Sequence, residues 1–282
     1  MRTRGFIVYC SPAGTTRQVA RQIEQTLAGL GAEVNTMDLG LSGRRDTFMA
    51  MIASMDKGDC LFVGAPVYRD VAAPPVMDFI EALPEVSARA AIPFVTWGAV
   101  TTGVALWQMG HGLQKKGFVL AGAASVVAEH CMMWRSEIAS GAGRPDSDDF
   151  QQVDGFTREI FERLRSGALK PVDLAHLDYQ PKRHATEMRQ KIGQPWMIVP
   201  KSVDEEKCSA CGVCVEQCPV GAVALNPYPA FADNCFDCFN CVRLCPEDAI
   251  DTPLSAEKIE AHIAMLKEKY REEVLTRVFL NQ

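Results

Sequence analysis

Eight of the eleven cysteines in this chain of 282 residues lie between positions 208 and 245. They form two runs of the pattern Cys-x-x-Cys-x-x-Cys-x-x-x-Cys-Pro, and the second run repeats the first at an offset of 27 residues. The segment is therefore an internal duplication. We expect these thiols to be reduced and to bind metal, because an odd cysteine count without an evident secretion signal argues against a disulfide framework.

Two kinds of metal centre use cysteines at this spacing. Three thiolates that are two residues apart wrap a tight loop around one face of an iron-sulfur cubane. Zinc also uses cysteine pairs two residues apart, but its four tetrahedral ligands leave the third cysteine of each run without a use. The pattern favours 4Fe-4S clusters, and the segment resembles a bacterial two-cluster ferredoxin over its whole length.

In the bacterial two-cluster arrangement, the fourth cysteine of each run ligates the other cluster. The resemblance therefore implies two crossed ligand sets. The first cluster is expected on Cys208, Cys211, Cys214 and Cys245, and the second on Cys235, Cys238, Cys241 and Cys218. The remaining thiols, which lie in apolar surroundings and are predicted to be unreactive core residues, are Cys10, Cys60 and Cys131.

A hydroxyl-rich loop from Ser11 to Thr16 joins the first apolar run to a segment of helical period, Arg17 to Leu30. Strand, loop and helix in this order form a phosphate-binding arrangement, in which backbone N–H groups and the helix N-terminus hold an anion. No Gly-x-Gly-x-x-Gly and no Gly-Lys-Ser/Thr sequence occurs, so the dinucleotide and P-loop fingerprints are missing. A plainer alternative is that Ser11 caps the helix.

The loop resembles the phosphate loop of flavodoxins, commonly Ser/Thr-x-Thr-Gly-x-Thr, and the resemblance covers roughly residues 4 to 165. Ser11, Gly14, Thr15 and Thr16 match this motif, whereas Ala13 stands where the family usually has a threonine and so removes one hydroxyl. The resemblance implies a flavodoxin-like sheet of order 2-1-3-4-5 that binds FMN at the carboxyl ends of strands 1 and 3.

Two further segments reach the same edge of the predicted sheet. The third strand leads into Pro66-Val67-Tyr68 and the fourth into Thr96-Trp97-Gly98-Ala99. Each offers an aromatic ring beside backbone polar groups, which suits a flat flavin ring, although both aromatic residues are as consistent with packing. His130 follows the fifth strand, where a structural hydrogen bond and a proton role beside the flavin are both open. The predicted FMN contacts are Ser11, Ala13, Gly14, Thr15, Thr16, Pro66, Val67, Tyr68, Thr96, Trp97, Gly98 and Ala99.

The elements that position these residues follow from the hydrophobic periodicity. The first 165 residues alternate short apolar runs with longer segments of helical period, the pattern of a parallel sheet covered on both faces. The predicted strands are 5–10, 33–39, 59–65, 92–97 and 117–127. A helical stretch follows each strand, most clearly from Asp146 to Leu164. The expected fold class is α/β, a five-stranded parallel sheet, with a small α+β ferredoxin-like domain.

Four segments are expected along the chain: a flavodoxin-like domain at 1–165, a linker at 166–198, a two-cluster domain at 199–253 and a C-terminal helix at 254–282. Prolines and basic residues gather in the linker, which is predicted either to be a solvated connector or to dock the acidic module that follows. The amphipathic C-terminal helix is predicted to pack back onto one of the two domains.

The net charge of −6 is unevenly distributed. Residues 1–200 carry 21 basic and 21 acidic side chains, whereas residues 201–250 carry 3 basic and 8 acidic ones. An acidic module of this kind does not bind nucleic acid, but it suits a redox partner with a basic docking patch. The acidic residues predicted to be exposed for steering are Asp204, Glu205, Glu206, Asp233 and Asp237. No apolar run of about 18 residues occurs, so we expect a cytoplasmic protein without a membrane span.

The whole chain resembles the flavodoxin-ferredoxin fusions of anaerobic prokaryotes. That resemblance implies an oxygen-sensitive electron carrier with FMN and two 4Fe-4S clusters, which serves a separate protein. One alternative is an oxidoreductase that reduces its own small substrate, for which a cavity beside Tyr68, Trp97 and His130 is needed. A structural or redox-sensing role for the cofactors is a third interpretation.

Overall fold

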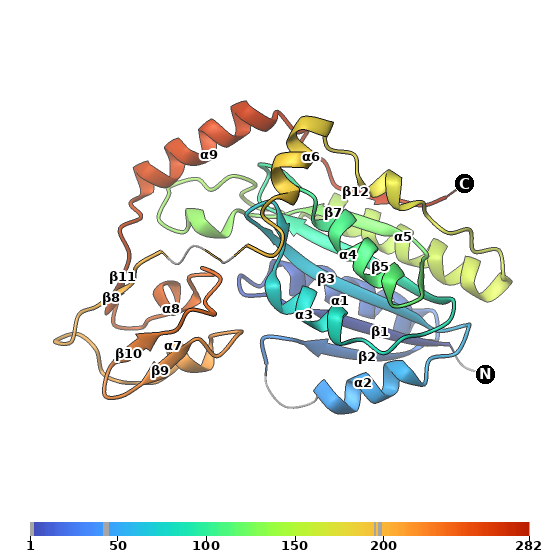
Figure 1. Ribbon diagram of the computed structural model, residues 1–282, viewed down its shortest axis with the longest axis horizontal. Helices are drawn as coiled ribbons and strands as arrows, with labels where there is room; N and C mark the ends of the chain where they lie inside the picture. Colours follow the sequence, from blue (N-terminus) through green and yellow to red (C-terminus); the bar gives the residue numbers. More distant parts are fainter. Residues whose placement is uncertain (1–2, 42–44, 195, 197–198, 282) are drawn as a thin grey trace.

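The computed structural model describes residues 3–41, 45–194, 196 and 199–281. Residues 195 and 197–198 of the predicted linker, and the outermost residues of the chain, lie outside this description. The chain forms two units that lie side by side, a larger one built on a sheet and a smaller cysteine-rich one, and a long helix runs along both (Figure 1).

The larger unit is built on a parallel sheet whose strands are β1 (Arg4–Tyr9), β2 (Glu33–Asp38), β3 (Cys60–Tyr68), β5 (Arg89–Trp97) and β7 (Ala123–Val127). Their order in space is β2-β1-β3-β5-β7, and all four pairings are parallel. This is the 2-1-3-4-5 order of a flavodoxin-like sheet, so the predicted fold class is confirmed. Apolar side chains fill β1, β3 and β5 because both faces of the sheet are covered.

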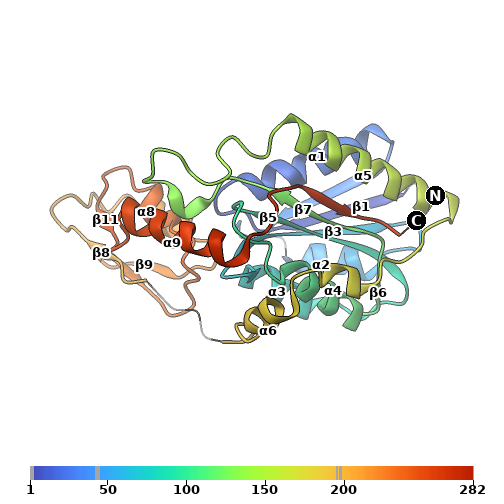
Figure 2. The same ribbon diagram turned by 90° about the horizontal axis from the view of Figure 1, so that it is seen from above.

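The helices that cover the sheet are α1 (Thr15–Gly29), α2 (Arg45–Ala53), α3 (Pro74–Ala82), α4 (Ala105–Lys115) and α5 (Ser147–Ser166). Helices α1 and α5 pack on one face, and α2, α3 and α4 lie on the other (Figure 2). Helix α5 begins where the sequence indicates, because the side chains of Asp146 and Asp149 form a reciprocal capping box. It ends at Gly167, which adopts the left-handed conformation with φ 70°.

Two strands differ from the prediction. Strand β3 continues to Tyr68 and folds back into β4 (Val71–Ala72) through Arg69 and Asp70, both with positive φ, as a tight two-residue hairpin turn requires. Pro66, Val67 and Tyr68 therefore belong to a strand and not to a loop. The predicted fifth strand divides into β6 (Phe118–Leu120) and β7, which pair with successive parts of β5.

The C-terminal segment is helical over only part of its predicted length. Helix α9 (Ala256–Tyr270) ends at Arg271, whose φ of 47° is left-handed, and the chain then forms strand β12 (Arg277–Phe279). This strand pairs antiparallel with β7 and covers the hydrogen-bonding groups that an edge strand otherwise leaves open. The expectation of a helix over 254–282 is therefore wrong beyond residue 270. A three-residue strand carries too little periodicity to be recognised.

The segment predicted to be a linker packs onto the larger unit. It contains a 3₁₀ turn, η2 (Leu174–Leu177), and helix α6 (Lys182–Arg189). Leu177 belongs to the core beneath the sheet, and Met188 packs beside Tyr270 of α9. Its basic groups are paired locally, Lys191 with Asp70 and Arg189 with Asp178. The described part of the segment is therefore packed and is not a solvated connector, and at its end the ring of Trp196 meets that of Phe236 in the smaller unit, with centroids 6.3 Å apart.

The smaller unit consists of β8 (Ser202–Val203), α7 (Val213–Glu216), β9 (Val223–Leu225), β10 (Pro229–Phe231), α8 (Asn240–Arg243) and β11 (Ile250–Asp251). Its strands form two antiparallel pairs, β9 with β10 and β8 with β11. The duplication is visible in the backbone, because positive φ angles recur at the same offset of 27 residues. The equivalent positions are Ala210 and Asp237, Gly212 and Phe239, and Gly221 and Asp248.

Candidate iron-sulfur and flavin site

The cysteines of the smaller unit gather into two groups that mix the two runs. A small cavity is lined by Cys208, Cys211 and Cys214 of the first run together with Cys245 of the second. We call these four residues the outer group. The other thiols surround Cys238, whose pKa is raised to about 12 by burial and then by neighbouring thiolates. Those neighbours, which with Cys238 form the inner group, are Cys218, Cys235 and Cys241.

The donor sets fit iron-sulfur clusters. In the described residues, no three Cys, His, Asp or Glu side chains converge closely enough to hold a single ion, whereas four thiols line one common cavity. Burial raises the pKa of Cys241 to about 11, so this thiol ionises only if a metal displaces its proton. Backbone N–H groups support the sulfurs equivalently, from Ala222 to Cys218 Sγ at 3.1 Å and from Ala249 to Cys245 Sγ at 3.3 Å.

The inner group lies against the edge of the sheet where a flavin is expected. The ring of Phe236, next to Cys235, meets the ring of Tyr68 edge-on with centroids 5.4 Å apart. Cys238 and Phe236 belong to the same buried cluster as Cys10, which follows β1 directly. The inner group is therefore the one that adjoins the phosphate loop and the end of β3, whereas the outer group includes the exposed Cys211.

A second contact between the units involves the segment after β7, which forms a 3₁₀ turn, η1 (Cys131–Met133). Trp134 packs on Phe239 with ring centroids 5.2 Å apart, and the guanidinium of Arg135 pairs with Asp251 at 2.5 Å. A cavity of about 590 Å³ opens here, lined by Trp134, Arg135 and residues around β8 and β11. Neither this cavity nor the cysteine-lined one includes Tyr68, Trp97 or His130.

The phosphate loop has the form of an anion site. Gly14 adopts φ 90° at the N-terminus of α1, and no atom lies within 4 Å of the position that its Cβ would take. Ser11 Oγ accepts a hydrogen bond from the N–H of Arg17 at 2.9 Å, so Ser11 does cap the first turn. Thr16 is buried and its hydroxyl pairs with that of Thr96 at 2.8 Å, whereas Thr15 is half-buried. The open loop, with Thr15 beside it, fits a phosphate group.

The two aromatic residues expected to contact the flavin ring are both buried. Tyr68 packs against Phe236, and its hydroxyl accepts a hydrogen bond from Cys131 Sγ at 3.3 Å. Trp97 is 1% exposed and packs with Val67 and Ala99, so it has a packing role. Its indole Nε1 is nevertheless buried with no acceptor in the described residues. An acceptor on a bound ring would satisfy that donor, which without a partner costs free energy.

The remaining residues of this edge lie close to one another. Gly98 adjoins His130 so closely that a Cβ on Gly98 would come within 2.4 Å of the imidazole ring. Burial, together with the charges of Lys267 and His262, lowers the pKa of His130 to about 4, so the ring is neutral at pH 7. His130 Nδ1 has no hydrogen-bond partner in the described residues. The carbonyl groups of Pro66 and Ala99 accept hydrogen bonds from the protein itself.

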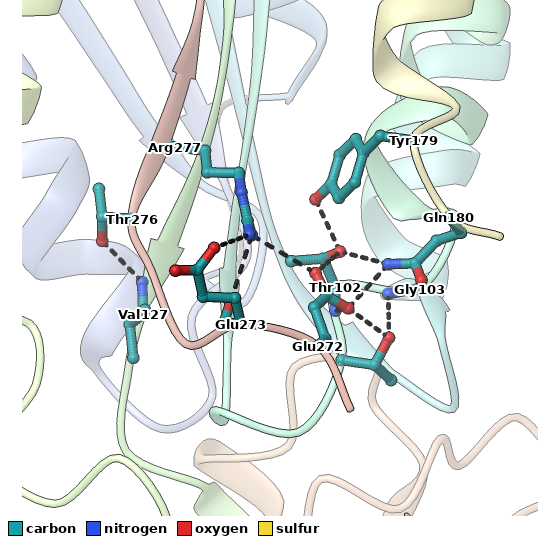
Figure 3. A network of polar contacts seen from close by, with 10 residues as sticks. Thr102, Gly103, Val127, Tyr179, Gln180, Glu272, Glu273, Thr276 and Arg277 are labelled. Atoms are coloured by element: carbon teal, nitrogen blue, oxygen red, sulfur yellow. Dashed lines mark hydrogen bonds and ion pairs between the residues drawn. The ribbon is translucent and has the colours of Figure 1, made fainter. Parts of the chain in front are cut away.

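A buried carboxylate near the same edge is not evident from the sequence. Glu272 lies between α9 and β12, and Figure 3 shows it at the centre of a polar network. Its oxygens accept hydrogen bonds from the Thr102 hydroxyl at 2.6 Å, from the Thr102 N–H at 2.9 Å and from Gln180 Nε2 at 2.7 Å. Thr101 Oγ1 donates a further one at 2.8 Å. The C-terminal segment thus holds the loop that follows β5, and a single glutamate in a charged stretch carries no sequence signal of such a role.

The expected steering residues are exposed with one exception. Asp204, Glu205, Glu206 and Asp233 are exposed. Asp237 is only 14% exposed and its carboxylate pairs with Lys201 at 2.9 Å, so its predicted exposure is wrong. The fold of the cysteine loop turns Asp237 inward, because its N–H donates to Cys235 Sγ at 3.5 Å.

Comparison with known proteins agrees with this geometry. Residues 201–224 match the family model of the 4Fe-4S binding domain. Over 82 residues, the chain is 33% identical to the thiosulfate reductase electron transfer subunit PhsB of Salmonella typhi, a match that covers 25% of this chain and 42% of that protein. The chain thus spans less than half the length of this curated relative.

Several solved structures resemble part of the chain. The rubredoxin oxygen:oxidoreductase of Desulfovibrio gigas has a TM-score of 0.46 at 18% identity, over 59% of this chain and 37% of that chain. A flavodoxin from the domain Archaea has a TM-score of 0.41 at 12% identity, over 57% of this chain and 99% of that chain. A Streptococcus pneumonia TIGR4 flavodoxin has a TM-score of 0.43 at 15% identity, with the same coverage.

The strand order and the family match together define the class of the protein. The chain joins a flavodoxin-like domain to a 4Fe-4S ferredoxin-type domain. The first half of the smaller unit thus carries the family signature of a 4Fe-4S binding domain. In the part of the chain that the structure describes, no helix is both long and apolar enough to cross a membrane.

Proposed function

We propose that this protein is an electron carrier that holds two 4Fe-4S clusters and an FMN and exchanges electrons with a separate protein. The observation that carries the proposal is the mixed grouping of the cysteines, in which Cys245 lines one cavity with Cys208, Cys211 and Cys214. This is the grouping that crossed ligation of two clusters requires. A cubane carries one electron at a time, whereas a flavin accepts two in separable steps. Clusters and a flavin in one protein can therefore convert between one-electron and two-electron transfer.

The positions of the inner and outer cysteine groups support a route for electrons through the molecule. The inner group adjoins Tyr68 and Cys10 at the flavin edge, and the outer group includes the exposed Cys211. Electrons from a partner would then enter or leave at the outer cluster and reach the FMN by way of the inner one. Ser11, Gly14, Thr15 and Thr16 would hold the FMN phosphate, and Trp97 Nε1 is a donor for the ring.

Iron, sulfide and flavin analysis tests this proposal on protein purified without oxygen. We expect about eight iron and eight sulfide per chain, together with one FMN, and paramagnetic resonance signals from two reduced clusters. Zinc without acid-labile sulfide would overturn it.

The alternative is an oxidoreductase with its own small substrate, which requires a cavity beside Tyr68, Trp97 and His130 that admits the substrate together with the FMN. Rapid reduction by NADH or NADPH alone, at a rate that matches turnover, would favour this alternative over the carrier.

Phosphate anchoring predicts that FMN binds more tightly than riboflavin. Replacing Thr15 with alanine is expected to weaken FMN binding by about 1 to 3 kcal/mol and to leave riboflavin binding unchanged, because only the phosphate loses a contact. Fluorescence titration of the apoprotein measures both affinities. Gln18→Ala, on the exposed side of the same helix, is the matched control. Equal affinities for FMN and riboflavin in the unmodified protein would contradict phosphate anchoring.

The hydroxyl of Thr16 offers a second variant. The Thr16→Ala change is expected to weaken FMN binding by a similar amount. It also leaves the buried Thr96 hydroxyl without its partner, so the protein should become less stable as well. Thermal denaturation alongside the titration separates these two effects.

Partner exchange is expected to depend on the acidic surface. With the reduced protein and a basic acceptor such as cytochrome c, the association rate should fall as salt rises, because charges are screened within about 8 Å at physiological ionic strength. Replacing Glu205 and Glu206 by glutamine should lower the rate at low salt. Glu81→Gln, an exposed acid on the larger unit, is the control and should have little effect. A salt-independent rate would count against steering by this surface.

A further inference from the structure

One lysine of the smaller unit is buried beside the inner group. The side chain of Lys201 is 1% exposed, although lysine is among the residues least often buried. Its Nζ lies 3.6 Å from Cys235 Sγ and donates to Asp237 Oδ1 at 2.9 Å and to the Val199 carbonyl at 3.1 Å. The ammonium also lies over the ring of Phe239, 5.1 Å from its centroid.

The ammonium keeps its charge in this position. The carboxylate of Asp237 pairs with the ammonium at 2.9 Å and the Val199 carbonyl accepts a second hydrogen bond from it, so the buried charge has a counter-ion and a polar partner. Asp237 is held in place in turn, because its second oxygen accepts a hydrogen bond from the Val199 N–H at 3.0 Å. A fixed positive charge therefore lies next to a cluster ligand, in surroundings with little water to screen it.

The outer group lacks this pair. The position equivalent to Asp237 in the first run is Ala210, with nearly the same φ, 53° against 55°. The lysine nearest in sequence to that run is Lys207, whose side chain is 61% exposed and pairs with Asp204 at 3.4 Å. Two sites that share a backbone and equivalent N–H contacts to sulfur thus differ in buried charge.

Reduction of a cubane adds one electron and makes the cluster and its thiolates more negative by one unit. A nearby positive charge stabilises the reduced state relative to the oxidised state and raises the reduction potential, and a nearby negative charge lowers it. Hydrogen bonds to the ligand sulfurs act in the same direction as positive charge. Lys201 supplies a positive charge and a hydrogen bond to Cys235, whereas Asp237 compensates part of the charge of Lys201.

We propose that Lys201 and Asp237 are a charge pair that sets the reduction potential of the inner cluster separately from that of the outer cluster. Lys201 raises this potential, and Asp237 positions the ammonium against Cys235 and limits the increase. The inference rests on the proposed binding of two clusters. It gives the two halves of the duplication different electronic roles, although their cysteine patterns are the same.

Potentiometric titration followed by paramagnetic resonance tests this assignment on the full-length holoprotein. Lys201→Met should lower the potential of the inner cluster, because the charge and the hydrogen bond to sulfur are lost and the Asp237 carboxylate remains. Asp237→Asn should raise it, because Lys201 then lies uncompensated beside Cys235. The double variant should lie between the two single variants. The inner cluster is the one whose signal disappears in Cys218→Ala.

Controls separate this inference from the proposed function. Lys207→Met should leave both potentials nearly unchanged, and Lys201→Arg should restore most of the shift caused by Lys201→Met. The inference is overturned if Lys201→Met and Asp237→Asn move the potential in the same direction, or if Lys201→Met has no more effect than Lys207→Met. Iron analysis of the unmodified protein tests the two-cluster proposal on its own, since one cluster per chain would remove that proposal whatever the potentials.

Discussion

Replacing Cys245 with alanine is expected to damage the cluster held by Cys208, Cys211 and Cys214 and to leave the other cluster largely intact. Cys245 belongs to the second run, but it lines the cavity of the first. Its Sγ also accepts a backbone N–H from Ala249, which fixes the thiolate in that direction. Resonance spectra of the reduced variant, with iron analysis, should show the loss of about one cluster's iron and a single remaining signal.

The reciprocal variant supplies the control. Cys218→Ala should remove the signal that survives in Cys245→Ala, because Cys218 is a neighbour of Cys238 in the inner group. Cys60 is a buried thiol in β3, far in sequence from the cluster cysteines, so both clusters should persist in Cys60→Ala. If each variant instead lost the cluster of its own run, the crossed assignment would be wrong.

Replacing Glu272 with alanine is expected to lower the free energy of unfolding by about 3 kcal/mol or more. The carboxylate is 8% exposed and accepts four hydrogen bonds, and hydrogen bonds to a charged group contribute about 1.5 to 3 kcal/mol each. Without it, the donors of Thr101 and Thr102 lose their acceptor, and Gln180 Nε2 keeps only its hydrogen bond to Thr102 Oγ1. Urea unfolding without oxygen, followed by tryptophan fluorescence, measures the free energy of unfolding.

The neighbouring residue is a matched control. Glu273 is 72% exposed and its carboxylate pairs with Arg277 at 3.5 Å, so Glu273→Ala should change stability by less than about 1 kcal/mol. The change at Glu272 should also speed amide exchange in β12, because this carboxylate anchors the chain between α9 and β12. Equal effects of the two changes would show that the network in Figure 3 contributes little.

The local predictions that proved correct rest on short-range physical signals. The parallel sheet follows from alternating apolar runs and helical segments, since each parallel strand needs a crossover helix after it, whereas its strand order was implied by the resemblance to flavodoxins. The start of α5 follows from Asp146, whose side chain satisfies the free N–H groups of the first turn. Burial of Cys10 and Cys60 follows from the apolar runs that contain them.

The errors share a different cause. The sequence indicated a linker where η2 packs on α4 and α6 packs beside α9, and a helix where Arg271 ends α9 and β12 begins. In both places the decisive contacts are distant along the chain, such as Met188 with Tyr270 and Val278 with Ala124. Local periodicity carries no record of such partners.

By itself, the sequence determined that the chain has a doubled cysteine pattern and a hydroxyl-rich loop between a strand and a helix, because both are encoded in consecutive residues. Only the tertiary structure decided that the inner group lies against Tyr68, that Asp237 turns inward to Lys201, and that Glu272 holds the loop after β5. All three depend on burial between segments that are distant in sequence, and burial is a property of the folded chain. For the two charged groups, burial also decides how strongly water screens the charge.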